Sequence, residues 1–569
     1  MRDGGRRPAV GCGLTLRRPG LRLPPARMRG PGVCGMSRTR LVFVNPYYAN
    51  RSDISSPVFF HNAAYQLKAY LETVPAVRRS YEIAIPDLSS LPPFQRGLTD
   101  EDDLNLLDAV LRQRPRIAAF SLYCWNVAGL HELAQALRKL APEVLRIAGG
   151  PEVYDRPDFV RQFPAFDVLV EGDGERPLRA VLERGADADL RGIPNVSFRR
   201  AGRWIHNPSR PAVCDINEIP NYYEARRRDL RGIGWYMTTR GCRNGCDYCL
   251  WARQPMRQKS RAKVLEELQT LIERTELRRL MLFDFDLLDL YRDDPALLEA
   301  IAGLVRRRGS DFTLNLWTNP ASIADPNLRR WVERLAVNRI IVGLQTGRRD
   351  AACAVHRPWI GSWVDPFLAV EESLRSRFVV ELIYPLPGET PASFRRTVER
   401  LLALGYYRLR VFHLMVLRGT QLRRRAADLG LRYLDRPPYF CTETPTSSPA
   451  ETLRIGRLGF VLTLLTSVLD GVRDADAVRR WFVADRGRIV GRLLAGLDRG
   501  LHPDEIVRRE VRSICAVDYP GSFVLGQYKG PPETAPSLYA LLDDPARPRG
   551  ADCRPRVRVG AARPRRTSR

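Results

Sequence analysis

The sequence has no long apolar run, no internal repeat and none of the common phosphate-binding or hydrolase motifs. A membrane-spanning helix needs about 18 apolar residues, and the most apolar stretch, residues 455–469, is shorter and is predicted to be a buried helix. The P-loop and the G-x-S-x-G and H-E-x-x-H motifs are also missing. These absences argue against a membrane partner and against the enzymes that those motifs mark, and we expect a cytoplasmic protein.

Lysine is scarce, with five residues, so the basic charge is almost entirely arginine. Residues 1–40 and 547–569 together hold nineteen Arg and two Asp, and therefore carry +17 of the net charge of +27. Because only +10 is left for the rest of the chain, a nucleic-acid groove is a disfavoured alternative. We expect residues 1–38 and 541–569 to be disordered basic segments, and translation to start at Met28 or Met36.

Eleven cysteines, an odd number scattered along the chain, do not form a disulfide pattern. Three of them, Cys242, Cys246 and Cys249, lie within GCRNGCDYCLW with the spacing C-x3-C-x2-C. Three such thiolates can bind three irons of a [4Fe–4S] cluster and leave the fourth iron open to a small molecule. Structural zinc is the alternative, but it needs four ligands, and no other Cys or His is near in the sequence.

The cysteine spacing, with Tyr248 directly before the third cysteine, resembles the radical S-adenosylmethionine (SAM) superfamily. The resemblance implies that Cys242, Cys246 and Cys249 are the catalytic metal ligands and that Tyr248 lies beside the cofactor. In that family the open iron chelates the amino and carboxylate groups of SAM, and an electron from the cluster cleaves SAM to a 5′-deoxyadenosyl radical.

Upstream of the cysteines, residues 39–200 alternate short apolar runs with amphipathic stretches. Five strands with crossover helices predict an α/β domain with a doubly wound parallel sheet, which binds ligands at the carboxyl ends of its strands. The strands are predicted at Leu41–Asn45, Tyr81–Ile85, Ile117–Leu122, Leu145–Gly149 and Phe166–Glu171. The helices are predicted at Val58–Val74, Asp102–Arg114, Val127–Ala141, Asp155–Phe163 and Glu175–Arg184.

GGPEV after the fourth strand and EGDGE after the fifth resemble the Rossmann-like cobalamin-binding domain found upstream of many radical SAM enzymes. The D-x-H-x-x-G motif, whose His coordinates cobalt in other cobalamin domains, is absent. A site for another nucleotide, or a plain scaffold, is the alternative for this sheet. The cobalamin contacts that the resemblance implies are Asn45, Ser121, Tyr123, Trp125, Asn126, Gly149, Gly150, Pro151, Glu152, Glu171, Gly172, Gly174 and Glu175.

After a predicted linker at residues 201–232, the alternation restarts and predicts six βα units over residues 233–415. This arrangement fits the partial (β/α)6 barrel of radical SAM enzymes, with reactive groups at the carboxyl ends of the strands. FDFD replaces the family's usual G-G-E after the second strand, whereas GLQTG and LPGE are similar to family segments. The implied SAM contacts are Asp284, Asp286, Asn315, Thr318, Gln345, Thr346, Gly388 and Glu389.

Residues 416–540 are predicted to form a mainly helical region that caps the barrel and shapes the substrate pocket. The combined resemblance implies a cobalamin-dependent radical SAM enzyme. We expect a C-methyltransferase that uses a [4Fe–4S] cluster, SAM and methylcobalamin on a small-molecule or peptide natural-product intermediate, with an electron donor such as flavodoxin or ferredoxin. A non-methylating rearrangement, cyclisation or oxidation, RNA modification, and a non-catalytic cobalamin- or cluster-binding sensor are the alternatives.

Overall fold

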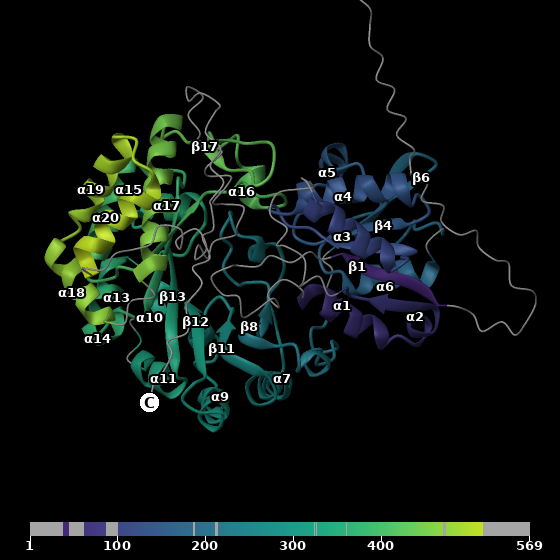
Figure 1. Ribbon diagram of the computed structural model, residues 1–569, viewed down its shortest axis with the longest axis horizontal. Helices are drawn as coiled ribbons and strands as arrows, with labels where there is room; N and C mark the ends of the chain where they lie inside the picture. Colours follow the sequence, from purple (N-terminus) through teal and green to yellow (C-terminus); the bar gives the residue numbers. More distant parts are fainter. Residues whose placement is uncertain are drawn as a thin grey trace, which may run out of the picture. The chain divides into compact units, whose positions relative to one another are not determined.

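The computed structural model describes residues 38–44, 62–86, 101–185, 188–210, 214–323, 325, 327–359, 361–469 and 474–515 (Figure 1). The predicted basic segments at the two ends, apart from Arg38, and the predicted cobalamin contact Asn45 lie outside the described residues.

The first part of the described chain is the predicted α/β sheet with helices on both faces. Strands β1 to β5 pair in parallel in the order β2-β1-β3-β4-β5. The strands are therefore added to the sheet first on one side of β1 and then on the other, and the strand order reverses between β1 and β3. Such a reversal marks where doubly wound sheets bind ligands. The strands are β1 Thr39–Val44, β2 Tyr81–Ala84, β3 Ile117–Ser121, β4 Leu145–Gly149 and β5 Val168–Val170.

Alternate residues of these strands enter two separate cores, because successive side chains of a strand point to opposite faces. Ile117 and Ala119 of β3 pack with one set of helices, and Ala118 and Phe120 pack with the other. The first set is α1 Asn62–Glu72, α2 Pro75–Ser80 and α6 Glu175–Arg184; the second is α3 Glu101–Arg112, α4 Val127–Leu140 and α5 Arg156–Gln162.

The sheet continues beyond the predicted domain boundary at residue 200. Strands β6 Val196–Arg200 and β7 Arg203–His206 add an antiparallel hairpin to β5. Its two-residue turn, Ala201-Gly202, has positive φ at both positions, as tight hairpins require. The predicted linker over residues 201–232 is therefore wrong at its start; the arginines that flank the turn hid the alternation of the strands.

The second part is an open barrel of six parallel strands within the described residues, in the order β8-β11-β12-β13-β14-β15. The strand order follows the chain order, as expected for consecutive βα units, which confirms the predicted partial barrel. The barrel strands are β8 Arg231–Tyr236, β11 Glu276–Leu282, β12 Thr313–Thr318, β13 Val337–Gln345, β14 Phe378–Tyr384 and β15 Leu409–His413.

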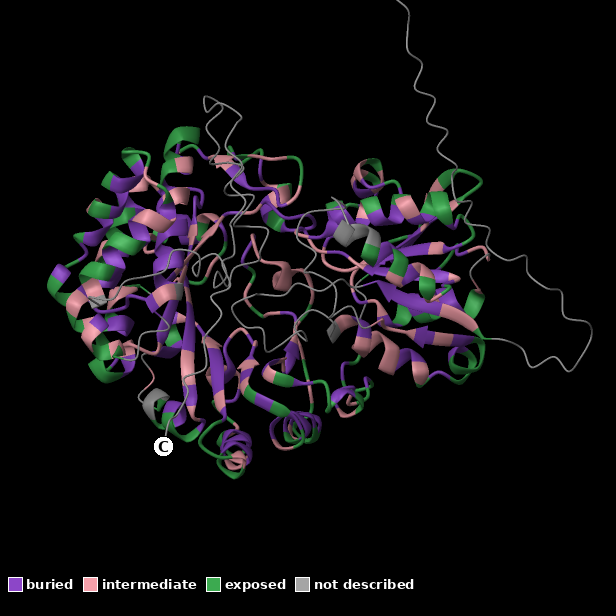
Figure 2. Cartoon of the chain, viewed as in Figure 1, coloured by how far each residue is buried: buried purple, intermediate pink, exposed green. Residues whose placement is uncertain are grey.

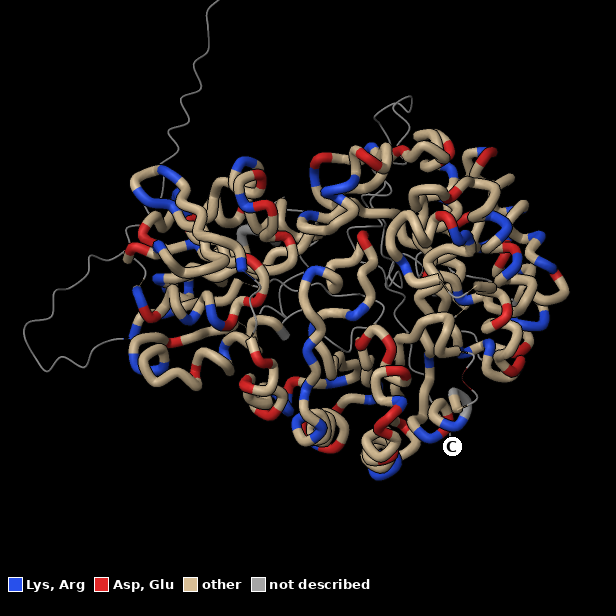
Figure 3. The backbone as a smooth tube through the Cα atoms, turned by 180° about the vertical axis from the view of Figure 1, so that it is seen from behind, with Lys and Arg blue, Asp and Glu red and all other residues tan. Residues whose placement is uncertain are grey.

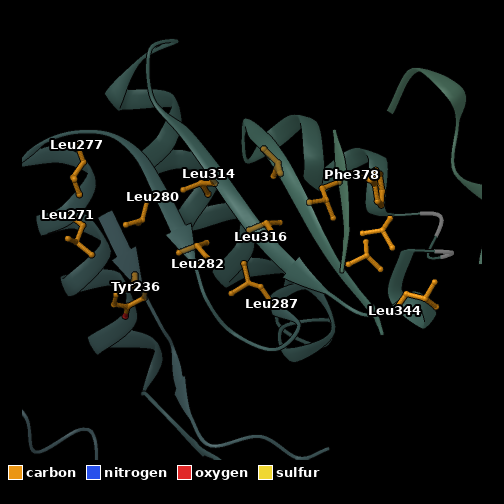
Figure 4. Close-up of a cluster of buried hydrophobic side chains, with 14 of the residues drawn as sticks. Tyr236, Leu271, Leu277, Leu280, Leu282, Leu287, Leu314, Leu316, Leu344 and Phe378 are labelled. Carbon is orange, nitrogen blue, oxygen red and sulfur yellow. The ribbon is translucent and has the colours of Figure 1, made fainter. Parts of the chain in front are cut away.

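Helices cover the outer face of the barrel strands, where leucines such as Leu271, Leu280 and Leu314 pack together (Figure 4). The strands are coloured mostly as buried, whereas the helices show exposed residues on one side only (Figure 2). The helices are α7 Arg261–Glu273, α8 Leu287–Leu290, α9 Pro295–Arg308, α10 Pro320–Ile323, α11 Leu328–Arg334, α12 Arg349–Ala354, α13 Val364–Ala369, α14 Glu372–Arg375 and α15 Pro391–Ala403.

The predicted helical segment after the barrel begins with a short helix, which is followed by a short antiparallel strand pair. Helix α17 then packs along β15, α19 and α20 pack on α17, and α18 packs on α15. The pair is β16 Arg432–Tyr433 and β17 Cys441–Glu443; the helices are α16 Gln421–Arg424, α17 Pro449–Leu469, α18 Ala475–Asp485, α19 Ile489–Asp498 and α20 Pro503–Cys515.

Candidate cofactor site

The cysteine loop follows β8, at the carboxyl end of the first barrel strand. A small hairpin, β9 Thr239–Arg240 and β10 Arg257–Gln258, closes the loop at its base. Gly241 starts the loop with φ +85°, and a Cβ there would lie 2.6 Å from the Pro255 carbonyl oxygen, so only glycine fits. Asp284, buried after β11, accepts hydrogen bonds from the Thr238 and Thr239 amides at 2.9–3.0 Å and fixes the turn into the loop.

Two groups contact the cysteine thiols, one from within the motif and one from outside it. Besides the Asn244 amide, which donates to Cys242 Sγ at 3.3 Å, Arg357 Nη1 lies 3.7 Å from Cys246 Sγ and 3.4 Å from the Tyr248 hydroxyl. Burial raises the pKa of the Cys249 thiol to about 11. Iron binding therefore has to replace a thiol proton here, and a nearby cation favours the resulting thiolates.

Asp247, between the second and third cysteines, anchors the loop to the rest of the protein. Its buried carboxylate pairs with Arg425 and with His356 Nδ1, the latter at 2.9 Å. Its amide donates to the Val355 carbonyl at 2.9 Å, and its carbonyl accepts from the Leu422 amide at 2.9 Å. The loop is thus held from the segment after α12 and from α16, elements that are far apart in the sequence.

Most of the predicted SAM contacts form hydrogen bonds that hold the strand ends together. Asp286 caps α8 and accepts hydrogen bonds from the Thr318 hydroxyl and the Asn319 amide at 3.2 Å. Glu389, which follows Gly388 and is fully buried, accepts from the Thr346 and Ser393 hydroxyls. Contact of these side chains with SAM stays a prediction, because the structure gives their oxygens other partners.

Two predicted SAM contacts have an unpaired oxygen inside the barrel. Asn315 Oδ1 and Gln345 Oε1 are buried and accept no hydrogen bond from the described residues. Both side chains lie on the strand face opposite the leucine core, since Leu314, Leu316 and Leu344 point outward. Unpaired buried acceptors are costly, and the hydroxyl and ammonium groups of SAM are donors that would satisfy them, so these residues fit the cofactor.

The predicted cobalamin contacts lie on three neighbouring loops at the carboxyl ends of β3, β4 and β5. Tyr123 and Trp125 stack with ring centroids 4.6 Å apart and are half-buried. Gly150 has φ +104°, and a Cβ there would lie 2.7 Å from the Leu122 carbonyl oxygen. The loops also contain Ser121, Asn126, Gly149, Pro151, Glu152, Glu171, Gly172, Gly174 and Glu175.

Flat aromatic rings and backbone without side chains suit a large planar ligand such as a corrin. Two polar residues of these loops instead bind other protein groups. Asn126 hydrogen-bonds within its own loop, to the Tyr123 amide at 2.7 Å and the Ser121 carbonyl at 3.0 Å. Glu171 pairs with Arg156 at 2.7 Å. The backbone and the rings, more than the acids, are therefore the candidate cobalamin surface.

Three arginines around the cysteine loop contact the loops after β4 and β5. Arg240 and Arg257 stand directly opposite each other in the β9–β10 hairpin and share Asp173. Arg240 also pairs with Glu175 at 2.9 Å, and Arg253 donates to the Pro151 carbonyl at 2.8 Å. Since like charges directly opposite in a hairpin repel, the acids of the EGDGE loop are required to balance the two arginines.

A second connection runs through the segment after the barrel. Arg418 is fully buried, with Nε 2.9 Å from the Tyr439 hydroxyl and 3.2 Å from Glu152 Oε1. The Tyr439 hydroxyl also donates to Glu152. Burial raises the pKa of Glu152 to about 7. Glu152 of GGPEV thus belongs to a network that includes Arg418, which follows the end of β15.

Across the described chain, basic and acidic positions are interleaved (Figure 3).

Sequence reasoning missed an aromatic group inside the barrel. Trp235 of β8, Phe283 directly after β11 and Trp317 of β12 have ring centroids 4.3–6.0 Å apart, and Trp251 of the cysteine loop lies 5.8 Å from Phe283. All four rings are half-buried. An aromatic residue at alternate positions of neighbouring strands is the sequence signal that could have identified them.

Within the described residues, no three Cys, His, Asp or Glu side chains are grouped as ligands of one metal ion. A [4Fe–4S] cluster does not require three ligands around one ion, because each cysteine binds a separate iron. Among the same residues, no helix is long and apolar enough to cross a membrane.

Residues 94–182 match the B12 binding domain, and residues 236–401 match the Radical SAM superfamily. The chain therefore carries a B12-binding domain followed by a radical SAM domain, the architecture of cobalamin-dependent radical SAM proteins. A radical SAM domain implies a [4Fe–4S] cluster and SAM, together with a substrate and a reductant, and a B12-binding domain implies cobalamin.

Two relatives are methyltransferases. The 2-(S-pantetheinyl)-carbapenam-3-carboxylate methyltransferase of Streptantibioticus cattleyicolor is 27% identical over 68% of this chain and 58% of its own length. The cobalamin-dependent radical SAM methyltransferase TokK of Streptomyces tokunonensis is 28% identical over 60% of this chain and 53% of its own length. The chain thus spans little more than half of either relative.

Among solved structures, the cobalamin-dependent SAM radical enzyme OxsB with aqua-cobalamin and SAM bound has a similar fold. The TM-score is 0.56 with 12% identity, and the match covers 89% of this chain and 80% of OxsB.

Proposed function

We propose that the protein is a cobalamin-dependent radical SAM C-methyltransferase that acts on a small-molecule or peptide natural-product intermediate. The observation that carries the proposal is the direct contact between the cysteine loop and the loops of the B12-binding domain through Arg240, Arg253 and Arg257. Methyl transfer requires the radical and the methyl donor to reach one substrate carbon, so the two cofactor sites have to adjoin. The two methyltransferase relatives support the same reaction.

When bound, the cluster and SAM supply the radical that removes a substrate hydrogen atom, and cobalamin supplies the methyl group. The chain's own residues bind, orient and exclude water. Cys242, Cys246 and Cys249 hold the iron, and Asp247 and Asp284 fix their loop. The half-buried rings of Trp235, Phe283 and Trp317 give the barrel interior an apolar wall that excludes water from a reactive radical. Within this proposal the enzyme is cytoplasmic and receives electrons from a donor such as flavodoxin or ferredoxin.

Metal analysis and product mass test the proposal. Protein purified without oxygen and supplied with hydroxocobalamin should contain about four irons and one cobalamin per chain. A first test substrate is 2-(S-pantetheinyl)-carbapenam-3-carboxylate, the compound named for the relative, followed by related carboxylates. We expect 5′-deoxyadenosine, S-adenosylhomocysteine and a product that is heavier by one methylene.

Formation of 5′-deoxyadenosine without S-adenosylhomocysteine or a mass increase would favour the non-methylating alternative. Replacement of Cys242, Cys246 and Cys249 together by Ala should abolish SAM cleavage and leave cobalamin binding largely intact. If that variant retained iron and activity, the cluster assignment would be wrong.

A further inference from the structure

Tyr439, in the segment after the barrel between β16 and β17, has an unusual backbone conformation. Its side chain is fully buried, and its φ of +61° lies in the left-handed region. That region is unfavourable for a bulky residue, so a tyrosine remains there only where its surroundings hold it. Backbone strain of this kind is typical of functional sites.

The hydroxyl of Tyr439 lies between two buried charges. Arg418 Nε donates to it at 2.9 Å, and the hydroxyl itself donates to Glu152 in the loop after β4. The Arg418 side chain is 0% exposed and that of Glu152 is 3% exposed. A buried ion pair adds little net stability, because the cost of desolvation offsets the attraction between the charges. A role in fixing the position of the loop after β4 accounts better for this pair and for the hydroxyl that bridges it.

The ring of Tyr439 packs where the other two loops come together. Tyr439 forms a small apolar cluster with Cys124 and Leu417, and Trp125 and Leu250 pack against this cluster. Cys124 and Trp125 belong to the loop after β3, and Trp125 is one of the two stacked rings of the candidate cobalamin surface. Leu250 directly follows the third cysteine of the iron-binding motif. The surroundings of Tyr439 therefore include both candidate cobalamin loops and the cysteine loop.

The cysteine loop holds the same part of the loop after β4 from a second side. Arg253 donates to the Pro151 carbonyl at 2.8 Å and also to the Arg418 carbonyl. Pro151 and Glu152 are therefore fixed both by the cysteine loop and by the segment after the barrel. Gly150, the preceding residue, has no room for a Cβ, so a shift of Glu152 would disturb the backbone that a corrin would contact.

We propose that Tyr439 is a positioning residue that aligns the two cobalamin loops with the cysteine loop. Its hydroxyl fixes the loop after β4 through Glu152 and Arg418, and its ring supports the loop after β3. The substitution Tyr439→Phe keeps the ring and removes only the hydroxyl, so it tests the alignment of the loop after β4 without creating a cavity. The effect on cobalamin affinity requires only the cofactor, whereas the effect on methyl transfer rests on the proposed function.

The first test is the cobalamin affinity of the full-length, iron-loaded protein, measured by absorbance titration with hydroxocobalamin. Tyr439→Phe should raise the Kd about 10-fold, the lower end for a hydrogen bond to a charged group, because Arg418 remains a partner of Glu152. Tyr406→Phe is the matched control, since Tyr406 is also fully buried and donates to the Phe367 carbonyl at 2.6 Å, within the leucine core. It should lower the Tm but leave the cobalamin Kd within twofold of wild type. The iron content should be unchanged in both variants.

The second test is the ratio of 5′-deoxyadenosine to methylated product at saturating cobalamin. Tyr439→Phe should form more 5′-deoxyadenosine per product than wild type, because SAM cleavage continues while the methyl donor is misaligned. A variant that is only less stable loses both products in proportion, so this ratio separates positioning from stability.

A cobalamin Kd within twofold of wild type in Tyr439→Phe, or an equal rise in Tyr406→Phe, would overturn the proposal. An unchanged product ratio would also overturn it, provided that the wild type methylates. If the wild type binds cobalamin but forms no methylated product, the proposed function fails, and the affinity test alone decides the role of Tyr439.

Discussion

Arg257→Gln should weaken cobalamin binding although Arg257 belongs to the radical SAM domain. The side chain is 12% exposed and pairs with Asp173, which is 6% exposed and lies in the EGDGE loop. It also donates to the Cys214 carbonyl at 2.9 Å. Removal of Arg257 leaves Asp173 with Arg240 alone, whose nitrogen is 3.3 Å away.

The size of the effect follows from the burial of the pair. Removing one partner of a buried ion pair costs about 3–5 kcal/mol when the other charge is left alone. Asp173 retains a second arginine, so the cost falls to about 2 kcal/mol, close to that of a charged hydrogen bond. If this free energy holds the EGDGE loop in its binding conformation, the Kd of cobalamin should rise about 30-fold, since 1.4 kcal/mol corresponds to a factor of ten.

The assay is an absorbance titration with hydroxocobalamin. Arg454→Gln, which breaks a half-exposed pair with Asp498, is the matched control and should change the Kd by less than twofold. Asp173→Asn should not add its full effect to Arg257→Gln, because the two side chains share one interaction. A Kd within twofold of wild type in Arg257→Gln, or fully additive effects in the double variant, would refute the coupling of the two domains through this pair.

Three further predictions concern the loop and the Glu152 network. Gly241→Ala should lose iron but bind cobalamin, because its Cβ would lie 2.6 Å from the Pro255 carbonyl; normal iron content would contradict this. Asp284→Asn should also lower the iron content, since Asn cannot accept with both oxygens from the turn before the loop. The pKa of Glu152 rises from 4.5 to about 7 by burial, so the folded protein holds a proton that the unfolded chain loses. Wild type should therefore lose about 2–3 kcal/mol relative to Glu152→Gln as the pH rises from about 5 to 8, and equal Tm changes in both would exclude it.

The sequence was sufficient to predict the two α/β parts, because buried parallel strands are short apolar runs that stand out between amphipathic helices. Leu145–Gly149 and Glu175–Arg184 have the predicted bounds. The β6–β7 hairpin was missed because exposed arginines interrupt its apolar positions. The single helix predicted at Val58–Val74 was also inaccurate: α1 ends at Glu72, and Pro75 starts α2.

Prediction of the site was limited for a different reason. The motifs identified the strand ends correctly, but a motif does not show which partner an acid will choose. A carboxylate at the carboxyl end of a strand is close to backbone amides of the next turn that have no other partner. These amides are always available to the carboxylate, whereas a ligand is available only when it is bound. Asp284, Asp286 and Glu389 have such local donors. Asn315 Oδ1 and Gln345 Oε1 have none among the described residues, and only the folded structure shows this.

This difference gives a physical criterion for separating cofactor contacts from structural residues in the barrel. A buried polar group that the fold already satisfies gains little from a ligand, because binding would exchange one hydrogen bond for another. A buried group without a partner gains the full interaction, and the protein bears the cost of leaving it unpaired until the ligand arrives. Asn315 and Gln345 meet this criterion, and Asp284 does not. Substitution of Asn315 or Gln345 should therefore change SAM affinity more than protein stability, whereas Asp284→Asn should change stability and iron content first. Equal losses of stability in both groups would show that the criterion fails for this barrel.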